Sequence, residues 1–156
     1  MNAEARLVEL NIELPPAPKA MGVYRPLLIV DNLAYLSGHG PLLDDGTLIT
    51  GRLGDDMDQA AGYQAARQTG LAMLATIRSE LGSLDRIARL VKTLGLVRCT
   101  PEYDQQPAVI NGFSELMRDI FGQENGVAAR SALGTSALPG GIAVEIEAQF
   151  ELRPGS

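Results

Sequence analysis

Few residues of this chain could carry chemistry, and most familiar catalytic sets cannot be built from them. The sequence holds one histidine, His39, and one cysteine, Cys99, which ends a buried-looking strand and is best explained as a structural thiol. A zinc site of Cys and His ligands and an internal disulfide both need more of these residues than are present. No Gly-x-Ser-x-Gly elbow, Gly-x-Gly-x-x-Gly or Walker A sequence occurs. The sequence therefore predicts neither a hydrolytic triad, a metal site nor a nucleotide-binding loop.

An arginine and a glutamate near the C-terminus are the remaining residues with a chemical use. Arg130 opens one predicted strand, and Glu145 lies early in the next, beside Glu147 on its polar face. Because Pro139-Gly140-Gly141 joins the two strands, we expect them to be antiparallel neighbours with Arg130 and Glu145 close across the sheet. Spacing alone favours a solvated ion pair worth less than ~1 kcal/mol. A cation beside Glu145 would keep its carboxylate ionised at neutral pH.

The elements that must position these residues alternate along the chain. Apolar periodicity predicts helices at residues 4–10, from about 55–58 to Gly82, and at 107–121, where Gly122 ends the last one. The predicted strands are residues 27–30, 33–37, 47–51, 89–97, 130–138 and 142–152, of which 89–97 is expected to be buried on both faces. Asp31-Asn32 is the turn of the first hairpin. This order predicts an α+β fold, a mixed sheet with two main helices packed on one face.

The composition limits the partners. The chain has 156 residues, 46% of them apolar, which is typical of one globular domain. We expect this domain to span residues 1–156, with an N-terminal helix and a Pro-rich entry segment at residues 1–19. Its 13 Lys and Arg against 19 Asp and Glu give a net charge of −6 without a basic run. Nucleic acid and anionic membranes are therefore disfavoured as partners. Residues 1–14 lack the apolar core of a signal peptide, and no run of about 20 apolar residues occurs, so we expect a cytoplasmic protein.

The residues around Arg130 and Glu145 resemble the C-terminal signature of the RidA/YjgF family of imine deaminases. This signature comprises Ala129-Arg130-Ser131, then Leu138-Pro139, then Val144-Glu145-Ile146-Glu147-Ala148. Further matches are Gly22-x-Tyr24, Ser37-Gly38-x-x-Pro41 and Asn111 in Val109-Ile110-Asn111. The resemblance covers about residues 20–152, and the N-terminal helix and the Gly134 region are more similar to a divergent branch.

The resemblance implies a chorismate-mutase-like fold, a homotrimer and a ligand cleft at each subunit interface, without a cofactor or metal. It implies that Arg130 grips the carboxylate of a 2-imino or enamino acid, for which its planar guanidinium is suited. Glu145 would position the water that attacks the imine, giving a 2-keto acid and ammonia and removing a reactive metabolite. The matched positions that shape the substrate pocket are Tyr24, Ser37, Gly38, Asn111 and Ala132.

Two positions depart from the family pattern. The family cysteine two residues after the arginine is Ala132 here, and the family glutamine after Ser-Gly is His39. His39 is either a pocket acid or base near neutral pH or a polar turn residue.

Two functions stay open, a deaminase and a non-catalytic trimer that binds small carboxylate metabolites in a regulatory or sensing role. Both need Arg130, whereas only the deaminase needs Glu145. RNA cleavage is a third reading, which the acidic charge and sparse aromatic residues oppose.

Overall fold

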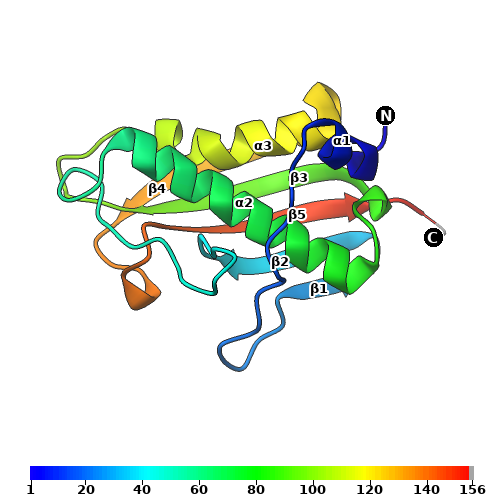
Figure 1. Cartoon of the computed structure of the whole chain (residues 1–156), viewed down its shortest axis with the longest axis horizontal. Coiled ribbons are helices and arrows are strands. Elements are labelled where there is room, and N and C mark those ends of the chain that lie inside the picture. Colours follow the sequence, from blue (N-terminus) through cyan, green and yellow to red (C-terminus); the bar gives the residue numbers. More distant parts are fainter. Residues whose placement is uncertain (155–156) are drawn as a thin grey trace.

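Three helices cover one face of a five-stranded sheet in the computed structural model, which describes residues 1–154 (Figure 1). The helices are α1 (Ala3–Glu9), α2 (Gln59–Leu81) and α3 (Gln106–Gly126), and short 3-10 turns form at Leu84–Arg86 and Pro139–Gly141. The strands are β1 (Leu27–Val30), β2 (Leu33–His39), β3 (Ile87–Arg98), β4 (Ala129–Thr135) and β5 (Val144–Leu152). The predicted α+β sheet with helices on one face is confirmed.

The order of the strands is β1-β2-β5-β3-β4, so β3 lies between β4 and β5. The strands that carry Arg130 and Glu145 are therefore not neighbours, and the predicted hairpin between them is wrong. The long helix α3 returns the chain so that β4 runs parallel to β3, as a β-α-β crossover does. β5 instead inserts between β2 and β3, where the side chains of Val144, Ile146 and Phe150 are completely buried.

Local signals set the ends of α2 as predicted. The Asp58 carboxylate caps the helix by accepting a hydrogen bond of 2.8 Å from the backbone N–H of Ala61. Gly82 ends it in the left-handed region, with a φ of 84°. The predicted end of α3 is wrong in part: Gly122, with a φ of 89°, interrupts the helix, and a further turn runs to Gly126.

Two strands differ from their sequence predictions, residues 47–51 in extent and β3 in burial. Residues 47–51 form only isolated bridges, Leu42 with Leu48 and Thr50 with Ile142, because their neighbours are loop segments rather than strands. β3 is buried on the helix side only, since no element among residues 1–154 covers the other face of the sheet.

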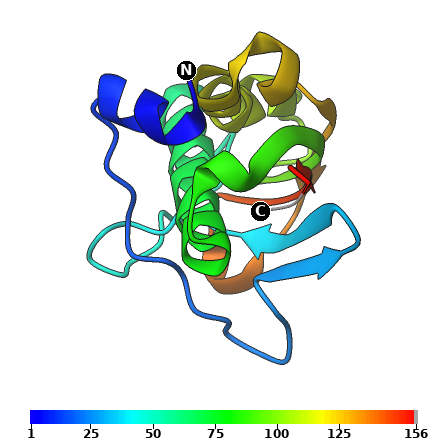
Figure 2. The same cartoon turned by 90° about the vertical axis from the view of Figure 1, so that its right-hand side faces the viewer.

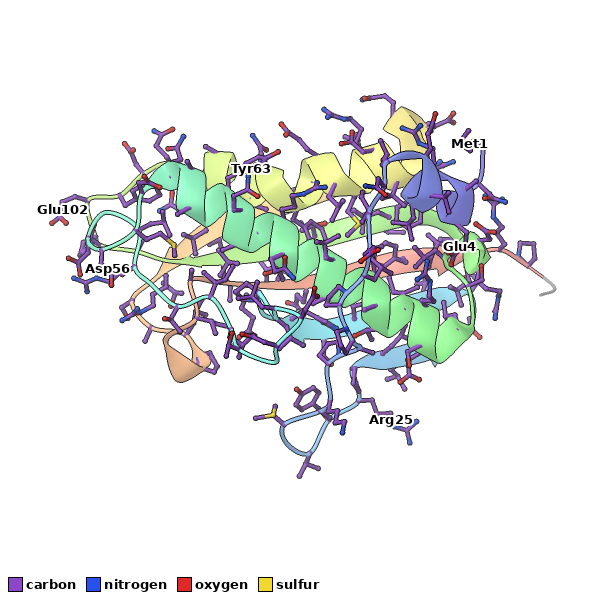
Figure 3. The ribbon with its side chains drawn as sticks, viewed as in Figure 1. Met1, Glu4, Arg25, Asp56, Tyr63 and Glu102 are labelled. Atoms are coloured by element: carbon purple, nitrogen blue, oxygen red, sulfur yellow. The ribbon has the colours of Figure 1, made fainter. Side chains whose placement is uncertain are left out.

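The N-terminal helix α1 is tied to the rest of the molecule by the Glu4 side chain (Figure 3). The Glu4 carboxylate accepts hydrogen bonds from the backbone N–H of Leu84, at 2.8 Å, and from Nε of Arg78, at 3.3 Å. In return, an Asp85 carboxylate oxygen accepts the backbone N–H of Glu4 at 3.0 Å. The extended residues 11–26 then pass the outer side of α2 before β1 begins (Figures 1 and 2).

Within residues 1–154, no helix has the length and apolar character needed to span a bilayer.

Candidate functional site

Arg130 lies on β4 and faces α3 on the helix-covered side of the sheet. One of its terminal nitrogens, Nη1, donates hydrogen bonds to Oδ1 of Asn111 at 2.8 Å and to Oγ of Ser114 at 3.2 Å. Both partners are neutral, and within residues 1–154 Arg130 forms no ion pair with a carboxylate. Its guanidinium has other N–H donors and an uncompensated charge, which suits it to an anionic ligand. We call Arg130, Asn111 and Ser114 the arginine group.

A cleft of about 350 Å³ opens beside the arginine group. It lies between α3, the segment that follows Gly122, and strands β3 and β4. Its polar walls are formed by Thr93, Asn111, Ser114, Glu115, Arg118, Gln123 and Arg130. Thr93 faces the same side of the sheet as Arg130, its register partner, and its buried hydroxyl has no hydrogen-bond partner within the described residues. The cleft therefore combines positive charge with unused hydrogen-bonding capacity.

Glu145 lies on the opposite, uncovered face of the sheet, against the backbone of Gly38. A Cβ atom on Gly38 would stand 2.2 Å from Oε2 of Glu145, so only glycine allows this approach. The pairing of β2 with β5 shifts register here, from Leu36 with Ala148 to His39 with Ile146, which makes Ser37 and Gly38 part of a β-bulge. We call Ser37, Gly38 and Glu145 the glutamate group.

The electrostatic environment of Glu145 is the reverse of the one predicted. Burial raises the pKa of the Glu145 carboxyl, and the negative charge of Glu147 raises it further. Arg130 is no partner, because it lies two strands away, roughly 10 Å in the plane of the sheet, and on the other face. The predicted ion pair is therefore absent, and with it the expected cation beside Glu145.

The other predicted pocket residues are Ala132, Ser37 and Tyr24, and the structure places only the first two at one of the groups. Ala132 follows Arg130 on the same face of β4, where its register partner is Gly95. Ser37 fixes the bulge by donating its hydroxyl to the Arg25 carbonyl at 2.5 Å. Within residues 1–154, Tyr24 forms no hydrogen bond with either group: it is 46% exposed, and its hydroxyl accepts the backbone N–H of Met21 at 3.2 Å.

His39 lies in a strand, so its predicted role as a turn residue is wrong, and it does not line the cleft beside the arginine group. It is the last residue of β2, and its side chain is buried against α2. Nδ1 lies 2.6 Å from the carbonyl oxygen of Ser37, so it must donate, and Nε2 then accepts the Thr76 hydroxyl at 2.8 Å. Burial lowers the pKa of the imidazole, although the bond to Ser37 opposes this effect. The neutral ring thus links the bulge to α2.

We expect the His39 imidazole to make stability fall with acidification. Below pH 6.5, the ordinary pKa of histidine, the imidazole is protonated in the unfolded chain but stays neutral in the folded protein, where its pKa is lowered. The free energy of unfolding therefore decreases as the pH falls from 6.5 toward the pKa of the folded protein. His39→Gln has no such proton and should show a flatter melting-temperature profile in this window. Equal profiles for the two proteins by differential scanning fluorimetry would contradict this role.

Sequence reasoning missed Ser114 and Thr93. Ser114 had a usable signal, since it lies three residues after Asn111 and therefore on the same side of a helix. The sequence held no such signal for Thr93, because its register opposite Arg130 depends on the parallel pairing of β3 with β4.

Within residues 1–154, no three His, Cys, Asp or Glu side chains gather in a way that could hold a metal ion.

Comparison with known proteins identifies the family to which this chain belongs. The family model described as YjgF/chorismate mutase-like, putative endoribonuclease, matches residues 4–141. Protein TCP17 of Trypanosoma cruzi is 37% identical over 148 residues, which make up 95% of this chain and 92% of that protein. The chain therefore belongs to the RidA/YjgF family, as its motifs predicted.

Solved structures agree with this assignment. A protein from Agrobacterium tumefaciens is 38% identical, with a TM-score of 0.85 over 96% of this chain and 91% of that one. A protein from Shewanella oneidensis described as a putative endoribonuclease is 30% identical, with a TM-score of 0.92 over 97% of this chain and 100% of that one. The chorismate-mutase-like fold predicted from the motifs is thereby confirmed.

Proposed function

We propose that the protein is a hydrolytic deaminase that converts reactive 2-imino and enamino acids into 2-keto acids and ammonia. Membership of the RidA/YjgF family is the general ground for this proposal. The observation that carries it is the presence of two complementary groups: an arginine that forms no ion pair within residues 1–154, and a half-buried carboxylate whose pKa is raised. The first suits the carboxylate of a substrate, and the second suits a general base.

In the proposed reaction, Arg130 binds the substrate carboxylate, with Asn111 and Ser114 fixing its orientation. A water held by Glu145 attacks the carbon of the protonated imine, forming a C–O bond, while the C=N electron pair moves to nitrogen. Glu145 takes the proton that the water loses and returns it to the amine nitrogen. The C–N bond then breaks, and the departing ammonia takes up the hydroxyl proton to leave as ammonium while the ketone forms. In the single chain the pKa of Glu145 is raised, which makes it a stronger base than an ordinary carboxylate, and in the reacting complex the substrate carboxylate offsets the positive charge of the arginine that binds it.

One chain cannot complete this site, because its two groups face opposite sides of the sheet. We propose a homotrimer in which the arginine group of one chain meets the glutamate group of its neighbour. The uncovered face supports this assembly, since it exposes large apolar side chains: Leu28, Val30, Tyr35 and Leu133. A hollow of about 360 Å³ beside Leu28, Tyr35 and Glu147 offers space for a neighbouring chain's side chains.

The alternative function is a trimer that binds small carboxylates without turnover. Ala132, at the position of the family cysteine, favours this alternative because it removes a polar group from the substrate pocket. RNA cleavage, the activity named for the Shewanella relative, is disfavoured by the net charge of −6 and by the glutamates that line the uncovered face of β5.

Ammonia release from 2-imino acids generated in place by an amino-acid oxidase tests the proposal. We expect turnover above the spontaneous rate, and sedimentation at a mass of about 50 kDa, three times the 16.6 kDa chain. Oxidase alone gives the background rate. A stable monomer at micromolar concentration would contradict the shared site, and carboxylate binding without ammonia release would replace the enzyme by the binding protein.

A further inference from the structure

We propose that the arginine cleft selects a dicarboxylic 2-imino acid, with Arg130 binding one carboxylate and Arg118 the other. This inference rests on the proposed function and names its substrate class. Both arginines belong to the walls of the same cleft, and no function assigned so far uses Arg118.

The spacing along α3 places the backbone of Arg118 one helical turn from the arginine group. Asn111, Ser114 and Arg118 follow one another at intervals of three and four residues, so they share one side of the helix. Arg130 is held at the Asn111 and Ser114 end. Arg118 starts one turn further on, about 6 Å along the helix axis. This separation is comparable to the distance between the two carboxyl groups of a five-carbon dicarboxylate.

The charges of the cleft leave Arg118 available to a ligand. Its only ion pair within residues 1–154 is with the adjacent Asp119, at 3.2 Å, and both side chains are more than 40% exposed. Such a pair is weak in water and can give way to a ligand in the cleft. The acidic wall residue Glu115 is already engaged, because its carboxylate accepts the hydroxyl of Tyr63 from α2 (Figure 3).

The size and polarity of the cleft also favour a second polar end on the substrate. A volume of about 350 Å³ exceeds what a short 2-imino monocarboxylate fills. The walls carry the polar Gln123 and Arg118 beside the apolar Leu90, Val127 and Ala128. An aliphatic substrate tail would leave the polar groups without partners, whereas a second carboxylate satisfies them.

Calorimetric binding of two unreactive keto acids of equal chain length tests the inference on the intact protein. The dicarboxylate is 2-oxoglutarate and the monocarboxylate is 2-oxopentanoate. The wild type should bind 2-oxoglutarate about tenfold more tightly or better, as expected for one added charge-assisted contact. Arg118→Gln should reduce this preference to within about twofold, chiefly by weakening the binding of 2-oxoglutarate. Asp119→Asn, the matched control, should retain the preference, because it removes only the surface partner of Arg118.

The outcomes separate this inference from the proposed function. If wild type and Arg118→Gln bind both acids with the same ratio, the dicarboxylate inference is wrong, while loss of both ligands in Arg130→Gln would still support the carboxylate clamp. If the wild type binds neither acid and releases no ammonia, the proposed function itself fails. The ratio of kcat/KM for the imines of glutamate and norvaline should change in the same direction as the binding ratio.

Discussion

Glu145→Gln should lower the rate of ammonia release by about 100-fold or more while leaving carboxylate binding intact. This is the usual scale for losing a positioned base. The amide keeps the size and a hydrogen-bonding oxygen of the carboxylate, so it can still lie against Gly38, but it cannot take the proton of the attacking water. Initial rates of ammonia release, together with 2-keto acid binding, separate these two effects.

The same substitution should raise the melting temperature at neutral pH. Because the folded pKa of Glu145 is raised, the folded protein holds a proton that the unfolded chain has released, so wild-type stability falls as the pH rises above 4.5 through the raised pKa. The amide introduced by Glu145→Gln does not titrate, so the variant avoids this loss. A residue that gains stability and loses turnover when neutralised is kept for chemistry rather than for folding.

Two other glutamates on β5, Glu147 and Glu151, serve as controls for Glu145. Glu147→Gln removes the negative charge that raises the pKa of Glu145, so it should move the acid limb of the pH–rate profile to lower pH and leave the neutral rate nearly unaltered. Glu151→Gln, farther along the strand, should change neither. Wild-type turnover in Glu145→Gln across the whole pH range would remove this residue from the mechanism.

Arg130→Ala should weaken the binding of 2-keto acids by about 100-fold, and Arg130→Lys by about tenfold. Alanine removes both the charge and the planar fork. Lysine restores the charge only, and its single ammonium cannot bridge Asn111, Ser114 and a ligand in the way that a guanidinium can. Isothermal titration with a 2-keto acid measures both losses.

Arg89→Lys is the matched control for Arg130→Lys. Arg89 also donates to an asparagine side chain, Oδ1 of Asn125 at 3.4 Å, but it is exposed and lies outside the cleft. Its replacement should leave binding unchanged. Equal affinities of Arg130→Lys and the wild type would mean that the guanidinium geometry does not contribute to recognition.

The elements of the fold were predictable where their signals are local. Asp58 and Gly82 mark the ends of α2 in the sequence, and strict alternation marks β5. The order of the strands was not predictable in this way. Pro139-Gly140-Gly141 has the composition of a hairpin turn, but the place of β5 is decided by the burial of Ile146 and Phe150 beneath the helices, which only an inner strand can achieve.

The candidate site was predictable as a set of residues but not as an arrangement. Family motifs pointed to Arg130, Asn111, Ser37, Gly38 and Glu145, and the structure brings the first two together and the last three together. The separation of these groups follows from β3 lying between β4 and β5. The raised pKa of Glu145 follows from the bulge at Gly38 and the half-buried position of the carboxylate, neither of which sequence spacing reveals.

The buried imidazole next to the bulge has a practical consequence for spectroscopy. His39 is the single histidine of the chain, so its ring nitrogens give one pair of signals in a ¹⁵N NMR spectrum, and no assignment is needed. Its Nδ1 is bonded to the Ser37 carbonyl, one residue from the glycine that supports Glu145. A ligand that reaches Glu145 should therefore shift the Nδ1 resonance, and the occupancy of the glutamate group can be followed in the unmodified protein.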